Sequence, residues 1–407
     1  MAETYELTLT TLTYGGDAMG RLPDSRAVFV PFGLPGERVR IRLTEEKRGF
    51  ARGEITEILQ ASPERIPPRC KHFGICGGCH YQHMPYETQL KVKADILRDQ
   101  LQRIGKIENP PVQATVASPK IWNYRNHIQF HLDKNGKIGF QAPSSNQVIP
   151  ISECHLPEAS INSLWPQLEF ESESGINRVS IRAGADDELM LVLESNSPET
   201  PELEIEADIS IAHVFENNSV IMAGNDHVKI KILDREFRVS PNSFFQVNTA
   251  MAEKMVAHIL SRLPVSQSVI LDVYCGVGLF SAFLAPKCKR LIGIESSPSA
   301  CEDFVINLDE FDNVDLYEDL AENVLTALKV KPDIILVDPP RAGVEKEALD
   351  AIVTMNPKMI AYVSCDPSTL ARDARRLIDN GYKLSDVTPF DLFPQTYHIE
   401  SISFFER

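Results

Sequence analysis

The sequence predicts a multidomain α/β protein with an N-terminal OB-like β-barrel, a β-rich central domain and a C-terminal doubly wound domain. Three observations lead to this prediction. With 407 residues, the chain is longer than one hydrophobic core usually needs. Its first 60 residues alternate apolar and polar positions, and from residue 249 helical and apolar strand patterns alternate. We expect the domains to span residues 1–62, 63–240 and 241–407.

Composition is that of a folded, water-soluble protein, with 43% hydrophobic and 24% charged residues. No apolar run is long enough to cross a membrane, and the N-terminus does not resemble a secretory signal, so we expect a cytoplasmic protein. The net charge of −16 argues against a nucleic-acid partner. Residues 61–140 nevertheless carry 12 Lys and Arg against 6 Asp and Glu, a local net charge of +6. A nucleic acid would therefore be bound through a limited basic surface.

The barrel is predicted from residues 5–9, 27–30 and 38–43, where apolar and polar side chains alternate between glycine-containing turns. Basic side chains recur on one face of these strands. Such a face is compatible with RNA binding, and a solvated barrel face explains the same pattern equally well.

Three further patterns extend the prediction along the chain. Apolar residues at helical spacing predict a helix over residues 87–104, which we expect to pack on the C-terminal domain. The region 112–240 is predicted to be rich in strands, with an acidic surface loop at 194–208. From residue 249 the order helix, strand, glycine loop, helix, strand predicts the Rossmann-like, doubly wound domain.

Four cysteines form a candidate metal site. Cys70, Cys76 and Cys79 are spaced Cys-x5-Cys-x2-Cys among glycines, and Cys154 follows later in the chain. Thiolates gathered in this way in a reducing compartment indicate a metal rather than disulfides. The spacing alone does not distinguish four-cysteine zinc from an iron–sulfur cluster.

Three segments of the C-terminal domain predict a site for S-adenosylmethionine. Residues 269–280 are an apolar strand followed by a turn in which Gly276 and Gly278 let the backbone approach a ligand at a helix N-terminus. Glu295 ends the next strand, where a carboxylate can accept the ribose hydroxyls. Asp338, followed by two prolines, ends a third strand and indicates a planar nitrogenous target. The competing interpretation is an α/β core with incidental turns.

A candidate nucleophile and a candidate base follow. Cys365 ends another apolar strand just before a helix predicted over residues 368–379, whose amide dipoles are expected to lower the pKa of the thiol. His398 and Glu400 lie near the C-terminus as a possible general-base pair. A buried small cysteine and two polar residues at a strand start are the alternative interpretation.

Taken together, these motifs resemble the RNA 5-methyluridine (uracil-5-)methyltransferases over nearly the whole chain. The resemblance rests on the four cysteines and on PNSFFQVN (241–248), LDVYCGVG (271–278), DPPRAG (338–343), SCDPSTLARD (364–373) and FPQTYHIE (393–400). The first 60 residues resemble the TRAM domain of that family, an OB-like RNA-binding barrel. The cysteine set resembles the [4Fe-4S] site of the ribosomal-RNA branch, which implies iron–sulfur rather than zinc.

The resemblance also implies residue roles. Cys365 would add to carbon 6 of a uracil, and Glu400 would remove the proton from carbon 5 after methyl transfer. Asp338 would additionally orient the uracil. Positions matching those that bind S-adenosyl-L-methionine in the family are Gln246, Tyr274, Gly276, Glu295, Asp319 and Asp338.

The expected partner is structured RNA, with 23S ribosomal RNA favoured over transfer RNA, and the expected state is a monomer without a membrane contact. The target uridine must be flipped out of its stack to be reached. Phe73, Tyr81 and Tyr124 could clamp its neighbours, although we favour packing around the cluster for each of them. The remoter alternatives are a methyltransferase for another substrate and a non-catalytic iron–sulfur RNA-binding protein. A methyltransferase for another substrate would not need Cys365 and Glu400. A non-catalytic protein would have lost the nucleophile or a donor-binding motif, and none of these is broken in this sequence.

Overall fold

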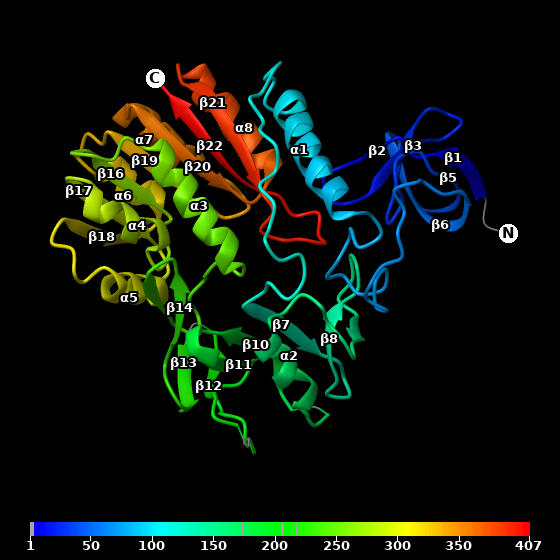
Figure 1. The fold of residues 1–407 in the computed structure, drawn as a ribbon, viewed down its shortest axis with the longest axis horizontal. Helices are drawn as coiled ribbons and strands as arrows, with labels where there is room; N and C mark the ends of the chain where they lie inside the picture. The colour runs from blue at the N-terminus through cyan, green and yellow to red at the C-terminus, as the bar shows by residue number, and fades with distance from the viewer. Residues whose placement is uncertain (1–3, 173, 205–206, 217) are drawn as a thin grey trace.

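The structure, a computed structural model, describes residues 4–172, 174–204, 207–216 and 218–407. These residues form one six-stranded sheet, two seven-stranded sheets and a two-stranded hairpin, arranged as three lobes (Figure 1). The predicted multidomain α/β organisation is confirmed. The loop predicted at 194–208 includes residues 205 and 206, which lie outside the described part. Within the described part, every helix is too short or too polar to cross a membrane.

The N-terminal lobe is a barrel-like sheet with the strand order β1-β5-β6-β4-β3-β2. Leu9, Val28, Val39 and Ile41 are fully buried inside it, as the alternating sequence pattern requires. Gly33 is needed where two segments touch, because a Cβ there would lie 2.3 Å from Leu9 Cδ1. The strands are β1 (Thr4–Thr8), β2 (Thr11–Leu12), β3 (Ala18–Arg21), β4 (Ala27–Val30), β5 (Arg38–Glu46) and β6 (Phe50–Gln60).

The basic side chains of β5 do not present an open positive face. Arg38 and Arg40 contact the carboxylate of Glu6 on β1 at 3.1 and 2.7 Å. Arg42 donates from Nε to Glu54 on β6 at 2.9 Å. These pairs are exposed, so each contributes little to stability. Of the two interpretations of this face, the structure favours a solvated barrel surface with its charges already paired.

The central lobe is a sheet with the strand order β13-β12-β11-β10-β7-β8-β9, in which β11 and β12 are parallel and the other neighbours antiparallel. The helix α2 (Ala159–Leu164) leads into Trp165, whose ring lies 5.5 Å from that of Phe130 in the core. The strands are β7 (His127–Leu132), β8 (Ile138–Gln141), β9 (Val148–Pro150), β10 (Ile176–Ala183), β11 (Leu189–Ser195), β12 (Ser210–Phe215) and β13 (Asn218–Ala223).

The C-terminal lobe has the strand order β18-β17-β16-β19-β20-β22-β21. The first five strands are parallel, and β22 is antiparallel to both of its neighbours. The central strand β19 is a continuous buried apolar run because helices cover both faces of the sheet, and Asp272 is the one charged residue within its neighbour β16. The strands are β16 (Val269–Val273), β17 (Arg290–Glu295), β18 (Val314–Glu318), β19 (Ile334–Val337), β20 (Met359–Ser364), β21 (Lys383–Phe390) and β22 (Glu400–Glu406).

Two separate cores form on the two faces of this sheet. One contains side chains of α3, α4 and α5 together with the hairpin β14 (Val228–Ile232) and β15 (Arg235–Val239). The other contains side chains of α6, α7 and α8. The helices are α3 (Thr249–Arg262), α4 (Leu279–Leu284), α5 (Pro298–Asn307), α6 (Ala321–Ala327), α7 (Lys346–Met355) and α8 (Pro367–Asp379).

The helix α1 (Tyr86–Arg103) lies between the barrel and the C-terminal lobe, as Figure 1 shows. The helix predicted over residues 87–104 is therefore present. Its apolar residues Ile96, Leu97 and Leu101 are buried in the same core as α6, α7 and α8. By packing, α1 is part of the C-terminal lobe although it precedes the central domain in the chain.

Two polar residues of α1 hold the segment that leads into β22. Lys93 Nζ lies 2.6 Å from Asp391 Oδ1 and donates to the carbonyl of Phe393 at 3.0 Å, and the lysine and aspartate side chains are both fully buried. Gln89 and Gln395 exchange two hydrogen bonds of 3.1 and 3.0 Å. The loop ahead of Glu400 is thereby fixed to α1 rather than only to its own sheet.

Candidate active site

The predicted site residues lie at one edge of the C-terminal sheet because of its topology. Tyr274, Glu295, Asp338 and Cys365 stand at or just after the carboxyl ends of β16, β17, β19 and β20, which are parallel. Glu400 begins β22, which runs antiparallel, so the start of β22 falls at the same edge. Ser364 pairs with Ser401 in this register, which brings the residues after β20 beside the start of β22.

The glycine turn after β16 is bound to the end of β17. Gly276 N–H donates to Glu295 Oε2 at 2.9 Å, while Oε1 of the same carboxylate accepts the N–H groups of Ser296 and Ser297, each at 2.8 Å. Gly278 has φ +92° and a Cβ there would lie 2.4 Å from Leu308 Cδ1, so this position requires glycine. A carboxylate has about four acceptor positions. Three are used, and one remains for a ligand hydroxyl.

The carboxyl group of Asp272, in the strand ahead of the glycine turn, was not among the predicted site residues. Asp272, within the otherwise apolar β16, is buried and accepts a hydrogen bond of 2.6 Å from Ser281 Oγ. Burial raises the pKa of Asp272 to about 7. Burial also raises the pKa of Asp338 to about 7, with further contributions from the charges of Asp272 and Glu295. An ionisable residue inside an apolar strand was the signal that could have identified Asp272.

Cys365 lies half-buried in the turn between β20 and α8. Burial raises the pKa of its thiol to about 12, and the negative charges of Glu400 and Asp338 act in the same direction, opposed by Arg341. The expectation that α8 would lower this pKa was wrong. The side chain of Asp366 already caps α8 by accepting the N–H groups of Ser368 and Thr369, so these donors are not available to a thiolate.

Glu400 is buried, and burial raises the pKa of its carboxyl group well above the usual range, with Asp338 adding to the increase and Arg341 opposing it. His398 is not paired with it as the sequence suggested. Its ring packs 4.4 Å from that of Tyr397 and burial lowers its pKa to about 3, so it is neutral. We call the sheet edge that carries Cys365, Asp338 and Glu400 the reactive edge. It combines one thiol and several carboxyl groups with the exposed Arg341.

The two remaining predicted donor-binding residues differ in their surroundings. Gln246 is buried just ahead of α3, and its carbonyl accepts a hydrogen bond of 3.1 Å from Asn126. Asp319 follows β18 and its N–H donates to the carbonyl of Glu295 at 3.0 Å. The carboxylate of Asp319 is exposed and accepts the N–H of Leu320 and the amide of Asn323 at 2.7 and 2.9 Å, so it is used within its own turn.

The turn that precedes Gln246 is held by two buried charged residues. Arg182 of β10 donates to the carbonyls of Ser240 and Ser243 at 2.8 and 2.7 Å. Asp303 of α5 accepts the N–H and hydroxyl of Ser240 at 2.8 and 2.7 Å and the hydroxyl of Ser243 at 2.6 Å. The turn thus links the central and C-terminal lobes and presents Phe244, which is 67% exposed.

The four cysteines predicted to bind metal line one cavity of about 40 Å³. Burial raises the pKa of Cys79, and Cys154, Cys76 and Cys70 lie near enough to add to the increase. Among the described residues, no three His, Cys, Asp or Glu side chains are arranged to hold a metal ion. The structure thus brings the four predicted cysteines to one cavity and does not distinguish zinc from an iron–sulfur cluster.

The aromatic residues in the segments around the four cysteines pack inside the protein and do not project into solvent. Tyr81 and Tyr124 are 0% and 2% exposed. Phe73 packs edge-on against Phe32 of the barrel lobe at 5.1 Å. Both rings are thus buried, Tyr81 as part of the barrel core, and they are not available to RNA bases in this structure.

Parallel strands with a glycine turn, an acidic residue at the end of the next strand and an N-terminal barrel are the features expected of an S-adenosylmethionine-dependent RNA methyltransferase. Comparison with known proteins gives the family. Residues 208–407 match the family described as tRNA (Uracil-5-)-methyltransferase, and residues 2–56 match the TRAM domain. The chain belongs to this family of RNA (uracil-5-)methyltransferases.

Relatives match over their whole length. An uncharacterised RNA methyltransferase of Halalkalibacterium halodurans is 34% identical, with 99% of this chain and 97% of the relative covered. One from Caldanaerobacter subterraneus subsp. tengcongensis is 33% identical, with 100% and 99% covered. The crystal structure of Pyrococcus abyssi tRNA (uracil-54, C5)-methyltransferase in complex with S-adenosyl-L-homocysteine has a TM-score of 0.76 at 24% identity, with 98% of this chain and 100% of that chain covered. That likeness concerns the fold.

Proposed function

We propose that this protein methylates carbon 5 of one uridine in structured RNA, with 23S ribosomal RNA as the first candidate. The observation that carries the proposal is the placement of Cys365, just after β20, and Glu400, at the start of the antiparallel neighbour β22, at the sheet edge that also carries the glycine turn. Methylation of an amino group needs no thiol, whereas carbon 5 of uracil becomes nucleophilic only after addition at carbon 6. A thiol and a buried carboxyl group together therefore favour carbon methylation.

In the proposed reaction, Cys365 as thiolate forms a bond to carbon 6, and the electron pair of the 5,6 double bond moves into an enolate. Carbon 5 then takes the methyl group that S-adenosylmethionine supplies. Glu400 as carboxylate removes the proton from carbon 5, the double bond re-forms and the Cys365–carbon bond breaks. The thiolate is restored and one proton is released. Asp338, near both residues, would orient the uracil.

For the methyl donor, Gln246, Tyr274, Gly276, Glu295, Asp319 and Asp338 remain the proposed contacts. Glu295 supports this assignment with the one acceptor position that its backbone hydrogen bonds leave on Oε2. The turn bearing Gln246 is rigid because of Arg182 and Asp303. Asp319 is the weakest of the set, since its carboxylate already bonds to its own turn.

Two RNA classes are candidates. The four cysteines resemble the ribosomal-RNA branch and favour 23S ribosomal RNA. Transfer RNA is the second candidate because the matched family and the Pyrococcus abyssi protein are both named for it. Nucleoside mass spectrometry of RNA from a strain that lacks this protein should show the loss of 5-methyluridine from one of these RNAs. If every 5-methyluridine persisted and the purified protein methylated neither RNA, the proposal would be wrong. That the protein acts as a cytoplasmic monomer stays a prediction.

We propose that Cys70, Cys76, Cys79 and Cys154 hold a [4Fe-4S] cluster, because they line one cavity and resemble the cluster site of the ribosomal-RNA branch. Such a cluster would tie the segment after the barrel to the start of the central lobe. Anaerobically purified protein should contain about four iron and four sulfide per chain. Cys154→Ser should lower both contents, and Cys288→Ser, whose half-buried thiol lies in the C-terminal lobe, should leave them unchanged. Zinc without sulfide would contradict this assignment.

The pH dependence of thiol addition follows from the raised pKa of Cys365. Because burial holds that pKa at about 12, only a small fraction is thiolate at neutral pH, and this fraction grows about tenfold per pH unit below the pKa. The rate of adduct formation with 5-fluorouridine RNA should therefore rise steadily from pH 6 to pH 8, measured in single-turnover gel assays. A rate that is independent of pH over this range would show that the thiol is already ionised, contrary to the structure.

A further inference from the structure

The barrel lobe touches the turn that carries the proposed nucleophile. Tyr14, which lies between β2 and β3, donates from its hydroxyl to Asp366 Oδ2 at 2.9 Å. Asp366 is the residue immediately after Cys365. The two partners are 352 positions apart in the chain, so this hydrogen bond exists only when the barrel is docked on the C-terminal lobe. A residue of the RNA-binding domain thereby reaches within one residue of the reacting thiol.

The same barrel turn also contacts the loop ahead of Glu400. The ring of Tyr14 packs edge-on against Tyr397 at 6.0 Å, and Tyr397 in turn packs against His80 at 4.5 Å. Gly16, with φ +94°, brings its backbone so close that a Cβ would lie 3.4 Å from both His80 and Tyr397. The turn containing Tyr14 is therefore held between the two segments that carry Cys365 and Glu400.

Asp366 connects the two lobes through its two carboxylate oxygens. Oδ1 accepts the N–H groups of Ser368 and Thr369 at 2.8 and 3.1 Å and fixes the first turn of α8. Oδ2 accepts the hydroxyl of Tyr14. Burial and the adjacent carboxylate raise the pKa of Tyr14 above its usual value, so this hydroxyl keeps its proton and acts as a donor. This one carboxylate therefore joins the α8 end of the turn around Cys365 to the barrel lobe.

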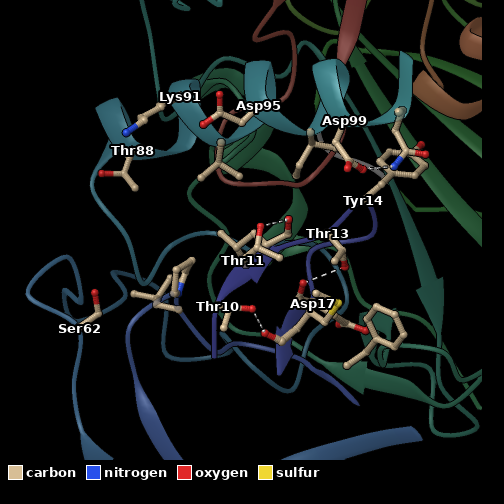
Figure 2. A pocket seen from close by; sticks show the side chains of 18 of the residues that line it. Thr10, Thr11, Thr13, Tyr14, Asp17, Ser62, Thr88, Lys91, Asp95 and Asp99 are labelled. Atoms are coloured by element: carbon tan, nitrogen blue, oxygen red, sulfur yellow. Dashed lines mark hydrogen bonds between the residues drawn. The ribbon is translucent and has the colours of Figure 1, made fainter. Parts of the chain in front are cut away.

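A cavity of about 660 Å³ lies between the barrel and α1, and Tyr14 is one of its lining residues. Figure 2 shows Thr88 and Lys91 on α1 at one end of the cavity and Tyr14 near Asp99 at the other. Val92 of α1 packs against the barrel core, and the hydroxyl of Tyr14 bonds to Asp366 of the C-terminal lobe. The hydrogen bond of Tyr14 is thus a direct polar link between the barrel and the turn that carries Cys365.

We propose that Tyr14 is a positioning residue for Cys365, which acts through Asp366 to fix the turn between β20 and α8. The proposal rests on the proposed function, because the nucleophilic role of Cys365 belongs to that function. Its consequence is that the barrel takes part in the chemical step as well as in RNA binding. If the barrel only bound RNA, a substitution of Tyr14 would change the Michaelis constant for RNA and leave the rate of thiol addition unaltered.

The test compares Tyr14→Phe with Tyr382→Phe. Both changes remove one tyrosine hydroxyl that makes a hydrogen bond, but the Tyr382 hydroxyl bonds to the carbonyl of Pro357, away from the reactive edge. With Tyr14→Phe, single-turnover adduct formation on 5-fluorouridine RNA should be about 10-fold slower, as expected for the loss of one hydrogen bond to a charged group. The Michaelis constant for RNA should stay within about 2-fold of wild type, and Tyr382→Phe should react at the wild-type rate.

A double-variant cycle tests whether Tyr14 acts through Asp366. Tyr14→Phe combined with Asp366→Asn should be no slower than Asp366→Asn alone, because both changes break the same link. If the rate losses of the two single changes multiplied in the double variant, the proposal would be overturned. A Tyr14→Phe variant that reacts at the wild-type rate, or that changes only the Michaelis constant for RNA, would overturn it as well. These outcomes presuppose that wild-type protein forms the adduct. If wild-type protein formed none and methylated no RNA, the proposed function would have failed instead.

Discussion

Cys365→Ala should abolish methyl transfer to RNA, with a loss of more than about 10⁴-fold. The reason is chemical: without addition at carbon 6, carbon 5 of the uracil is too weak a nucleophile to accept the methyl group. The alanine side chain leaves the fold intact, since Cys365 is only half-buried at the end of a turn. The variant should also fail to form the covalent adduct with 5-fluorouridine RNA, which denaturing gels detect directly.

Cys288→Ala is the matched control for this experiment. Cys288 is also a half-buried thiol of the C-terminal lobe, but its Sγ lies against the carbonyl of Ala285, next to the short helix α4 and away from the reactive edge. This variant should methylate RNA at the wild-type rate. An adduct that persists in Cys365→Ala would assign the nucleophile to another residue and refute the role proposed for Cys365.

Lys93→Met should lower the free energy of unfolding of the C-terminal lobe by about 3–5 kcal/mol. Lys93 and Asp391 are both fully buried and 2.6 Å apart, so removing the ammonium leaves the carboxylate of Asp391 without its counter-charge in the protein interior. The carbonyl of Phe393 loses its donor as well. Urea unfolding followed by a signal from this lobe should show a clear decrease in the midpoint.

Two further variants make this prediction specific. Arg98→Met removes a cation from the same helix, but its partner Asp95 is 55% exposed, so stability should change by less than about 1 kcal/mol. Lys93→Met combined with Asp391→Leu removes both buried charges and should recover most of the loss. A double variant as unstable as the single one would show that packing, not the unpaired charge, causes the effect.

Much of the fold follows from periodicity in the sequence. The apolar strands of the C-terminal sheet and the helix over residues 87–104 have strong local patterns, and both are present. We expected this helix to pack on the C-terminal domain, but periodicity alone does not show which lobe a helix joins. The packing of α1 on the C-terminal core depends on contacts between segments far apart in the chain, such as Lys93 with Asp391. These partners cannot be identified from one sequence.

The candidate site was predictable where a residue stands at the end of a strand, as Glu295, Asp338 and Cys365 do. Its electrostatics were not. The expectation of a lowered thiol pKa at Cys365 failed because burial and neighbouring carboxyl groups dominate, and because the side chain of Asp366 already occupies the helix terminus. Tyr14 gave no signal at all, since its importance arises only from the docking of the barrel.

The position of β22 has a consequence for how the C-terminal sheet is assembled. This strand follows β21 in the chain but lies between β20 and β21 in the sheet, and its first residue is Glu400. Insertion of β22 gives β21 its pairing partner and, in the same step, brings the proposed base beside the end of β20. Completion of the sheet and assembly of the proposed pair of Cys365 and Glu400 are therefore one event. A molecule in which β22 has not been inserted lacks both.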